Sequence, residues 1–247
     1  MKKLLTLILA FVVCFGVVST IGCGGSGSAN FREITADDFR VATQNINSNE
    51  DVPFMIGIEN GINFHVDEKG QLYGSNYNES YDVKLVKVGN SYEFIHVQKS
   101  TDAFFNIDQV QYFKDDFCYY LDKSETVPYK WKMPYPFEDT LYQFIYEYES
   151  YIMTFDEAEY LIEANSTAKY YIDDSGSTTK LKVDIRTPFA NNTETTTVIY
   201  EVDENNAIIS YSLNYKGIQS QWTVSLTTFS GTLDFPSDLD SYELIDY

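Results

Sequence analysis

Cysteine is nearly absent from this chain, which has three in 247 residues. Cys14 lies within an apolar N-terminal run and Cys23 follows that run, so Cys118 is the one cysteine in the body of the protein. The residues around it, 117–120, are otherwise Phe and Tyr, and this apolar, strand-like setting predicts a small buried hydrophobe rather than a nucleophile. We therefore expect a fold without internal disulfides that depends on its hydrophobic core.

Basic side chains are also scarce. The chain has 17 Lys and Arg against 37 Asp and Glu, which gives a formal net charge of −20. Nucleic-acid binding rests on Lys and Arg contacts to phosphate, so no nucleic-acid partner is expected. The same excess of acid argues against a polybasic membrane-binding surface.

The sequence lacks the familiar catalytic and cofactor motifs. It contains no G-x-S-x-G, no phosphate-binding glycine loop, no H-E-x-x-H and no C-x-x-C. Its two histidines are His65 and His96, and His65 would share one face of a strand with Asp67. Such a pair suits a metal or catalytic site, but two polar residues on the outer side of a hairpin explain it equally well. We expect a protein that is not an enzyme, with no catalytic residue, no metal and no cofactor.

What the chain does have is a distinctive N-terminus. Lys2 and Lys3 precede an apolar run over residues 4–18, too short for a comfortable membrane span, and Thr20-Ile21-Gly22-Cys23 follows. This resembles a bacterial lipoprotein signal peptide, although such signals usually have Leu, Val or Ile where this chain has Thr20. The resemblance implies a signal peptide over residues 1–22 and a diacylglyceryl group on Cys23, which becomes the mature N-terminus. An ordinary secretory signal and an uncleaved anchor are the alternatives.

By that resemblance the protein is extracytoplasmic and lipid-anchored at the cell membrane or outer membrane. Loss of Lys2 and Lys3 leaves 15 basic residues against 37 acids, a charge of −22, so the acyl chains alone would hold the protein to the membrane. Residues 23–30 have the composition of a flexible tether that reaches at most about 25 Å. Residues 31–247 are long enough for a single domain with a sizeable core.

Helical spacing occurs at two places in the body of the chain. Thr35 is expected to cap a short helix that buries Phe39. Residues 137–152 carry an apolar stripe at helical spacing, and a capping-box pattern at 154–157 predicts a second helix.

Elsewhere the hydrophobic pattern has period two, and turn residues predict how the strands pair. Gly89 and Asn90 fit a two-residue turn that places Leu85 beside Phe94. In the C-terminal third, a turn at Lys216-Gly217 and a loop over residues 203–206 would align three strands on one apolar face. The pairs expected there are Tyr211 with Trp222, Ile209 with Val224, and Tyr200 with Ile209.

The order of these elements resembles the lipoprotein-carrier superfamily of LolA, LolB and LprG-type proteins. The shared order is lipobox, tether, first helix, antiparallel meander, helix pair and second meander. In that superfamily a curved sheet wraps around helices and encloses an apolar groove for acyl chains. The resemblance implies an α+β fold over residues 31–247, with a large, half-barrel-like antiparallel sheet and a few helices packed on its concave face.

Two functions follow from these expectations. The first is a membrane-anchored envelope protein that binds an acyl chain or another hydrophobic small molecule. The alternative is a non-enzymatic lipoprotein that binds glycan or a protein partner through exposed aromatics, since the chain has 21 Tyr, 17 Phe and 2 Trp. Strands favour aromatic residues in any case, so packing also explains this content. The candidate ligand-lining residues are Phe144, Tyr148, Tyr200, Ile209, Tyr211, Trp222 and Val224.

Overall fold

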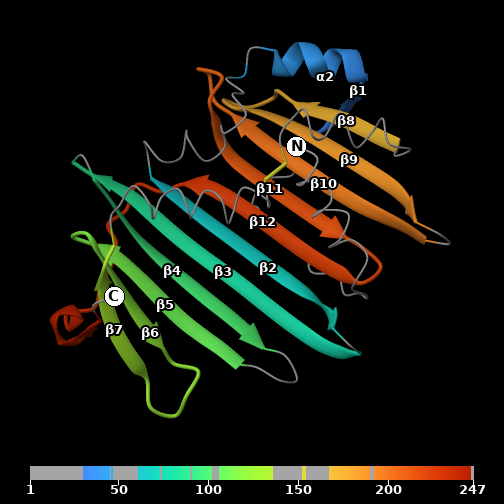
Figure 1. Cartoon of the computed structure of the whole chain (residues 1–247). Helices are drawn as coiled ribbons and strands as arrows, with labels where there is room; N and C mark the ends of the chain where they lie inside the picture. The colour runs from blue at the N-terminus through green and yellow to red at the C-terminus, as the bar shows by residue number, and fades with distance from the viewer. Residues whose placement is uncertain are drawn as a thin grey trace.

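One large sheet makes up most of this computed structural model (Figure 1). The structure describes residues 30–44, 46, 61–72, 74–89, 91–101, 106–135, 152–153, 167–189 and 192–245. Of these residues, 66% lie in strands and 7% in helices. The strands are β1 (Arg32–Ile34), β2 (Ile62–Leu72), β3 (Ser75–Val88), β4 (Ser91–Thr101), β5 (Asn106–Lys114), β6 (Phe117–Asp122), β7 (Tyr129–Pro134), β8 (Thr167–Asp173), β9 (Thr179–Phe189), β10 (Asn192–Val202), β11 (Ile208–Lys216), β12 (Ser220–Thr228) and β13 (Glu243–Leu244). The helices in the described ranges are α2 (Ala36–Thr43) and the 3-10 helix η2 (Leu239–Ser241).

Two antiparallel meanders join to form this sheet. The strands lie in the order β1-β8-β9-β10-β11-β12-β2-β3-β4-β5-β6-β7-β13. Strands β2 to β7 form one meander and β8 to β12 the other, and β12 pairs with β2 where they meet, with Val224 opposite Val66. The last pair, β13 with β7, is parallel. Strands β1 and β13 lie at opposite ends of the sheet, which is therefore open rather than closed (Figure 1).

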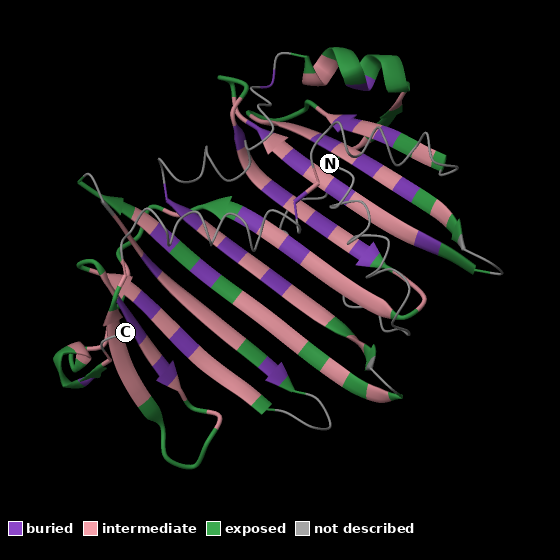
Figure 2. Cartoon of the chain, in the orientation of Figure 1, coloured by how far each residue is buried: buried purple, intermediate pink, exposed green. Residues whose placement is uncertain are grey.

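Alternation along the strands gives the sheet two different faces. On one of them, here named the core face, buried residues of neighbouring strands lie opposite one another and form bands across the sheet (Figure 2). The alternate residues, among them His65, Asp82 and Ser225, form the opposite face. Fully burying such an apolar side chain contributes about 1.5–3 kcal/mol, so the core face supplies most of the folding energy. One of its rows, at most 2% exposed throughout, consists of Val83, Phe64, Leu226, Tyr211, Tyr200 and Leu181.

The C-terminal segment covers one end of the opposite face. A second hydrophobic cluster lies there, in which Tyr242 packs with Tyr112 and Tyr119 of β5 and β6. Lys130 of β7 holds this segment in place, since its Nζ lies 2.6 Å from Asp238 Oδ2 and 5.4 Å from the centre of the Tyr242 ring. The opposite face is thus apolar and covered at this end.

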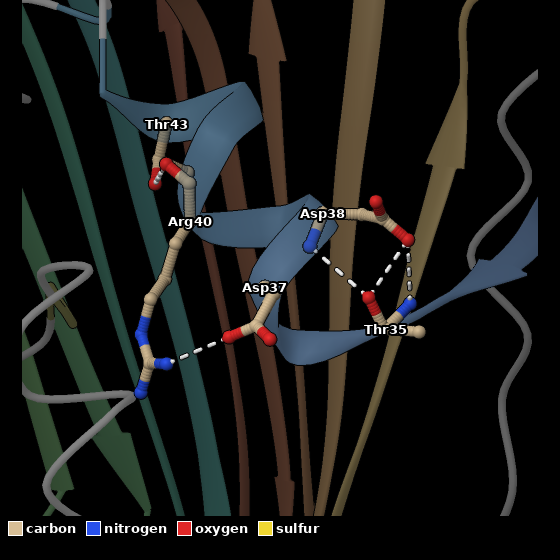
Figure 3. A network of polar contacts seen from close by, with 5 residues as sticks. All are labelled: Thr35, Asp37, Asp38, Arg40 and Thr43. Carbon is tan, nitrogen blue, oxygen red and sulfur yellow. Dashed lines mark hydrogen bonds and ion pairs between the residues drawn. The ribbon is translucent and has the colours of Figure 1, made fainter.

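Helix α2 begins as the sequence predicts. Thr35 is the N-cap: its hydroxyl accepts a hydrogen bond from Asp38 N at 3.1 Å, and the Asp38 carboxylate accepts one from Thr35 N at 3.3 Å (Figure 3). This reciprocal capping box satisfies N–H groups that have no partner inside the helix. Phe39 is buried and its ring lies 4.9 Å from that of Tyr170, so the helix packs on β8 at one end of the sheet.

The predicted α+β class is wrong. The described residues form one 13-stranded sheet with a single α-helix at its end, which is a mostly-β architecture and not a sheet with several helices on a concave face. The predicted helices over 137–152 and 154–161 lie almost wholly outside the described residues. Ile152 is described: it is buried, as its place on the apolar stripe requires, but it has no regular secondary structure. Within the described ranges, no helix is long and apolar enough to cross a bilayer.

The predicted pairing in the C-terminal third keeps the correct face but has the wrong register. Tyr211 lies opposite Tyr200 and Leu226, whereas Trp222 lies opposite Tyr215. The hairpin does not turn at Gly217, whose N–H bonds to Ser220 O at 2.9 Å. A Cβ at Gly217 would lie 2.3 Å from the Tyr215 hydroxyl oxygen, so this glycine makes room for the tyrosine ring instead of forming the turn.

Other predictions are confirmed. Leu85 pairs with Phe94 across the turn that begins at Gly89, which has φ 64°. Cys118 is a buried free cysteine, and burial raises the pKa of its thiol to about 12, which leaves it unreactive at neutral pH.

Replacing Thr35 with Ala tests whether the cap stabilises α2. Thr35→Ala removes the acceptor of the Asp38 N–H, so we expect the helix to lose about 1 kcal/mol and its amides to exchange about five-fold faster. Hydrogen exchange followed by mass spectrometry measures this effect. Thr43→Ala is the matched control, because the Thr43 hydroxyl donates to Arg40 O at the other end of the helix. Equal acceleration in both variants would contradict the capping role.

Candidate functional site

The predicted ligand-lining residues that the structure describes belong mainly to a closed core. Tyr200, Tyr211 and Val224 are 1%, 0% and 2% exposed. The Tyr200 hydroxyl donates to Met153 O at 2.6 Å, and the Tyr211 hydroxyl accepts from Met153 N at 2.9 Å. Both phenols thus bind the backbone of a segment that lies over the core face. Cys23, Phe144 and Tyr148 lie outside the described residues.

Ile209 and Trp222 lie apart from that group. A register shift between Glu201 and Val202 leaves Ile209 as the extra residue of a bulge, and Ile208 takes the buried position in its place. Trp222 is half-buried, with its ring 5.3 Å from that of Tyr215. The structure therefore brings Tyr200 and Tyr211 together, with ring centres 5.4 Å apart, but places neither Ile209 nor Trp222 in the predicted contacts with them.

Two carboxylates face each other on the core face beyond the apolar rows. Glu68 of β2 lies opposite Glu79 of β3. Burial raises the pKa of Glu68, with a further contribution from the Glu79 charge, while the hydrogen bond from the Tyr77 hydroxyl at 2.5 Å opposes the shift. Glu79 accepts from the Tyr81 hydroxyl at 2.6 Å and from Gln98 Nε2 at 3.1 Å. Tyrosine and amide donors thus satisfy both acids, and no group of described side chains is arranged to hold a metal ion.

The core face changes character between β4 and β7. Apolar residues give way there to two rows of amide and aromatic side chains, which we name the amide–aromatic surface. One row runs from His96 of β4 to Trp131 of β7, and the other from Gln98 of β4 to Tyr129 of β7. The full rows are His96, Gln111, Tyr120, Trp131 and Gln98, Gln109, Asp122, Tyr129.

Its aromatic part lies on the two strands nearest the edge. The rings of Tyr120 and Trp131 stack at 4.8 Å with 23° between their planes. Tyr129, two residues before Trp131 and on the same face of β7, is 53% exposed. Burial, with the nearby Asp122 carboxylate, raises the pKa of Tyr120 to about 12, so its hydroxyl stays protonated. These rings present both apolar surface and hydroxyl donors.

Its polar part is held by hydrogen bonds within the surface. Gln109 Nε2 donates to Asp122 Oδ2 at 3.1 Å, and Ser124 N donates to Asp122 Oδ1 at 2.8 Å. Although burial opposes the shift, these donors lower the pKa of Asp122, which is therefore a carboxylate at neutral pH. His96 Nδ1 lies 3.4 Å from Gln111 Oε1. Amide, carboxylate and aromatic groups thus lie together on a half-exposed sheet surface, an arrangement suited to binding a polar ligand with flat apolar faces.

The glutamines are the residues that sequence reasoning missed. Gln109 and Gln111 occupy alternate positions of a strand whose next alternate residue, Phe113, belongs to the core face. The available signal is that polar or aromatic residues occupy alternate positions in 106–113, 118–122 and 129–133. Each of these strands is too short for that alternation to indicate a shared polar surface.

His65 and Asp67 do share one face, as predicted, and the structure adds a third group. On the opposite face, His65 Nδ1 lies 2.7 Å from Asp82 Oδ1 and Nε2 lies 3.2 Å from Asp67 Oδ2. The hydrogen bond to Asp82 is the main cause that raises the pKa of His65 to about 9, against an opposing effect of burial. Both ring nitrogens bind carboxylates, so this cluster is an ion-pair network on the outer side of a hairpin.

No protein-family model matches this chain, and no curated protein matches its sequence.

The His65 network predicts how stability depends on pH. Because the folded pKa of about 9 lies above the ordinary value of 6.5, its contribution is complete below pH 6.5 and is lost as pH rises through 9. The His65 side chain is 35% exposed, so solvent screening reduces the expected loss to about 1 kcal/mol. Urea unfolding across this pH range measures it. His65→Gln should abolish the loss and His96→Gln should retain it; an unchanged pH dependence in His65→Gln would refute the assignment.

Proposed function

We propose that this protein is a lipid-anchored envelope lipoprotein that binds a neutral glycan and catalyses no reaction. The observation that carries the proposal is the amide–aromatic surface, where the stacked pair Tyr120 and Trp131 adjoins Gln109, Gln111 and Asp122. A sugar ring has apolar C–H faces and a rim of hydroxyls. Aromatic rings suit the faces, while amides and a carboxylate suit the hydroxyls.

Charge supports a neutral ligand. In the described strands β2 to β12, the core face carries the acids Glu68, Glu79, Asp122 and Glu194 and a single cation, Lys87 at the far end of β3. An acidic glycan would meet more carboxylates than cations on the core face of these strands. Neutral sugars carry no such penalty.

The closed core favours the glycan over the acyl-chain alternative. An acyl chain needs an apolar cavity, but the predicted lining residues Tyr200, Tyr211 and Val224 are at most 2% exposed. The bonds of both tyrosines to the Met153 backbone would have to break before a chain could enter beside them. Native mass spectrometry of the purified protein tests this alternative directly, since a copurifying lipid would support it.

Trp131→Ala tests the glycan site. Loss of the indole removes one stacking ring, so binding should weaken at least about ten-fold, or about 1.4 kcal/mol, while Trp131→Phe should restore most of it. Calorimetric titration with a panel of soluble neutral β-glucans and chitooligosaccharides is the measurement. Lys132→Ala is the matched control, because Lys132 follows Trp131 along β7 but lies on the opposite face.

The outcomes separate clearly. Weakened binding in Trp131→Ala with an unchanged melting temperature, and full binding in Lys132→Ala, supports the site. Absence of binding to every member of the panel, or equal weakening in both variants, contradicts it.

Cys23→Ser tests the anchor. A serine hydroxyl cannot take the thioether-linked diacylglyceryl group, so the variant should leave the membrane fraction. Fractionation after a carbonate wash, with Cys14→Ser as the matched control, measures this. Quantitative retention of the Cys23→Ser variant would show that the apolar run itself is the anchor.

A further inference from the structure

The lysines and arginines of the sheet are segregated onto one face. Among the described strands β2 to β12 there are twelve such residues, and eleven of them lie on the opposite face, with Lys87 as the exception. The eleven are Lys69, Lys84, Lys99, Lys114, Lys130, Lys132, Lys169, Lys180, Lys182, Arg186 and Lys216.

The opposite face carries fewer acidic residues than basic ones. The same strands carry seven acids against eleven cations, and in β8 to β12 and β2 to β4 alone the count is six acids against eight cations, a net charge of +2 in a chain whose total is −20. Glu33 of β1 is an eighth acid on this side and pairs with Lys169. Some of the lysines pair with these acids: Lys182 Nζ lies 2.8 Å from Asp184 Oδ2, and Lys114 Nζ lies 2.9 Å from Glu93 Oε1. Cations still outnumber acids on this face, whereas acids outnumber cations on the core face.

Protonated His65 adds to the positive charge of the opposite face. The C-terminal segment limits which part of that face is accessible. That segment covers β5 to β7, where Lys114 and Lys130 contact Phe235 and Asp238. The cations elsewhere on the face, such as Lys69, Lys99 and Lys216, are exposed. The accessible cationic area thus extends over β8 to β12 and β2 to β4.

The expected tether enters the domain at this same face. Asn30 N donates to Asp173 Oδ2 at 3.0 Å, and the Phe31 ring lies 5.7 Å from Lys182 Nζ. Lys182 also lines a cleft of about 500 Å³ over β8, β9 and β10, together with Lys169, Arg186 and Asp184. Asn30 lies seven positions after Cys23, so an acyl group on Cys23 would hold this corner within about 25 Å of the lipid.

We infer that the opposite face of β8–β12 and β2–β4 lies against the anionic phosphate headgroups of the bilayer, so that the core face and its amide–aromatic surface point away from it. The inference rests on the acyl anchor of the proposed function. The anchor supplies affinity, and the cations supply orientation at about 1 kcal/mol for each one near an anionic surface. The acids of the core face reinforce this orientation, because the same surface repels them.

Lysine reactivity in reconstituted vesicles tests the orientation. The full lipidated chain is placed in phosphatidylcholine vesicles or in vesicles that also contain phosphatidylglycerol, and acetylation is followed by mass spectrometry. Lys84 and Lys87 are a matched pair, since they lie three residues apart on β3 but on different faces. Phosphatidylglycerol should slow acetylation of Lys84 and Lys99 about five-fold and leave Lys87 and Lys123 unchanged, and high salt should abolish the difference.

Two triple variants with the same change in net charge complete the test. Lys69→Gln/Arg186→Gln/Lys216→Gln removes exposed cations from the opposite face, and we expect it to lose the protection of Lys84 and Lys99. Arg40→Gln/Lys87→Gln/Lys123→Gln removes three exposed cations elsewhere, and protection should persist.

Failure of the orientation and failure of the anchor give different results. If the protein floats with both kinds of vesicle but phosphatidylglycerol protects no lysine, the orientation is overturned and the anchor stands. If it floats with neither, both are overturned, because nothing then holds this face beside a membrane. Loss of protection in the control triple variant would also overturn the orientation, since overall charge rather than the face would be responsible.

Discussion

The pairing of β12 with β2 is the interaction on which the rest of this structure depends. It joins the two meanders, and nine consecutive residue pairs hold it, from Ser220 with Gly70 to Thr228 with Ile62. Phe229 N extends the junction by donating to Gly61 O at 2.8 Å. Gly61 has φ 82°, and a Cβ there would lie 2.3 Å from Phe229 O, so only glycine permits this approach. Without the junction each meander would expose a long edge and half of the core face.

Local signals in the sequence predicted local structure well. The Thr35 cap, the turn at Gly89 and the burial of Cys118 each depend on a few neighbouring residues, and all three are confirmed. Period-two alternation likewise identified the buried face. Register was harder, because it depends on contacts that alternation does not encode: the room that Gly217 leaves for Tyr215, and the bulge at Ile209. The α+β class was wrong because it was drawn from the order of the expected elements, which does not fix how many helices pack on a sheet; the stripe over 137–152 lies almost wholly outside the described residues.

Total charge was the least informative property of the sequence. A sum of −20 argues against a polybasic membrane-binding surface. Successive residues of a strand point to opposite faces of the sheet, however, so one face can differ in sign from the whole molecule. The lysines are spread along the chain from Lys69 to Lys216 and form no run that a scan for charge clusters would find. The glutamines at 98, 109 and 111 are hidden in the same way, since only the pairing of β4 with β5 brings them together.

The short strands at the two ends of the sheet bear on the proposed attachment of this protein to a membrane. Molecules attached to one membrane share two dimensions, and their local concentration far exceeds that of the same number free in solution. Under such crowding, a long unpaired strand would recruit the equivalent strand of a neighbour and polymerise along the membrane. Here β1 has three residues and β13 has two, and β13 pairs in parallel with β7. The long strands lie inside the sheet, so its two ends offer only short edges for such pairing.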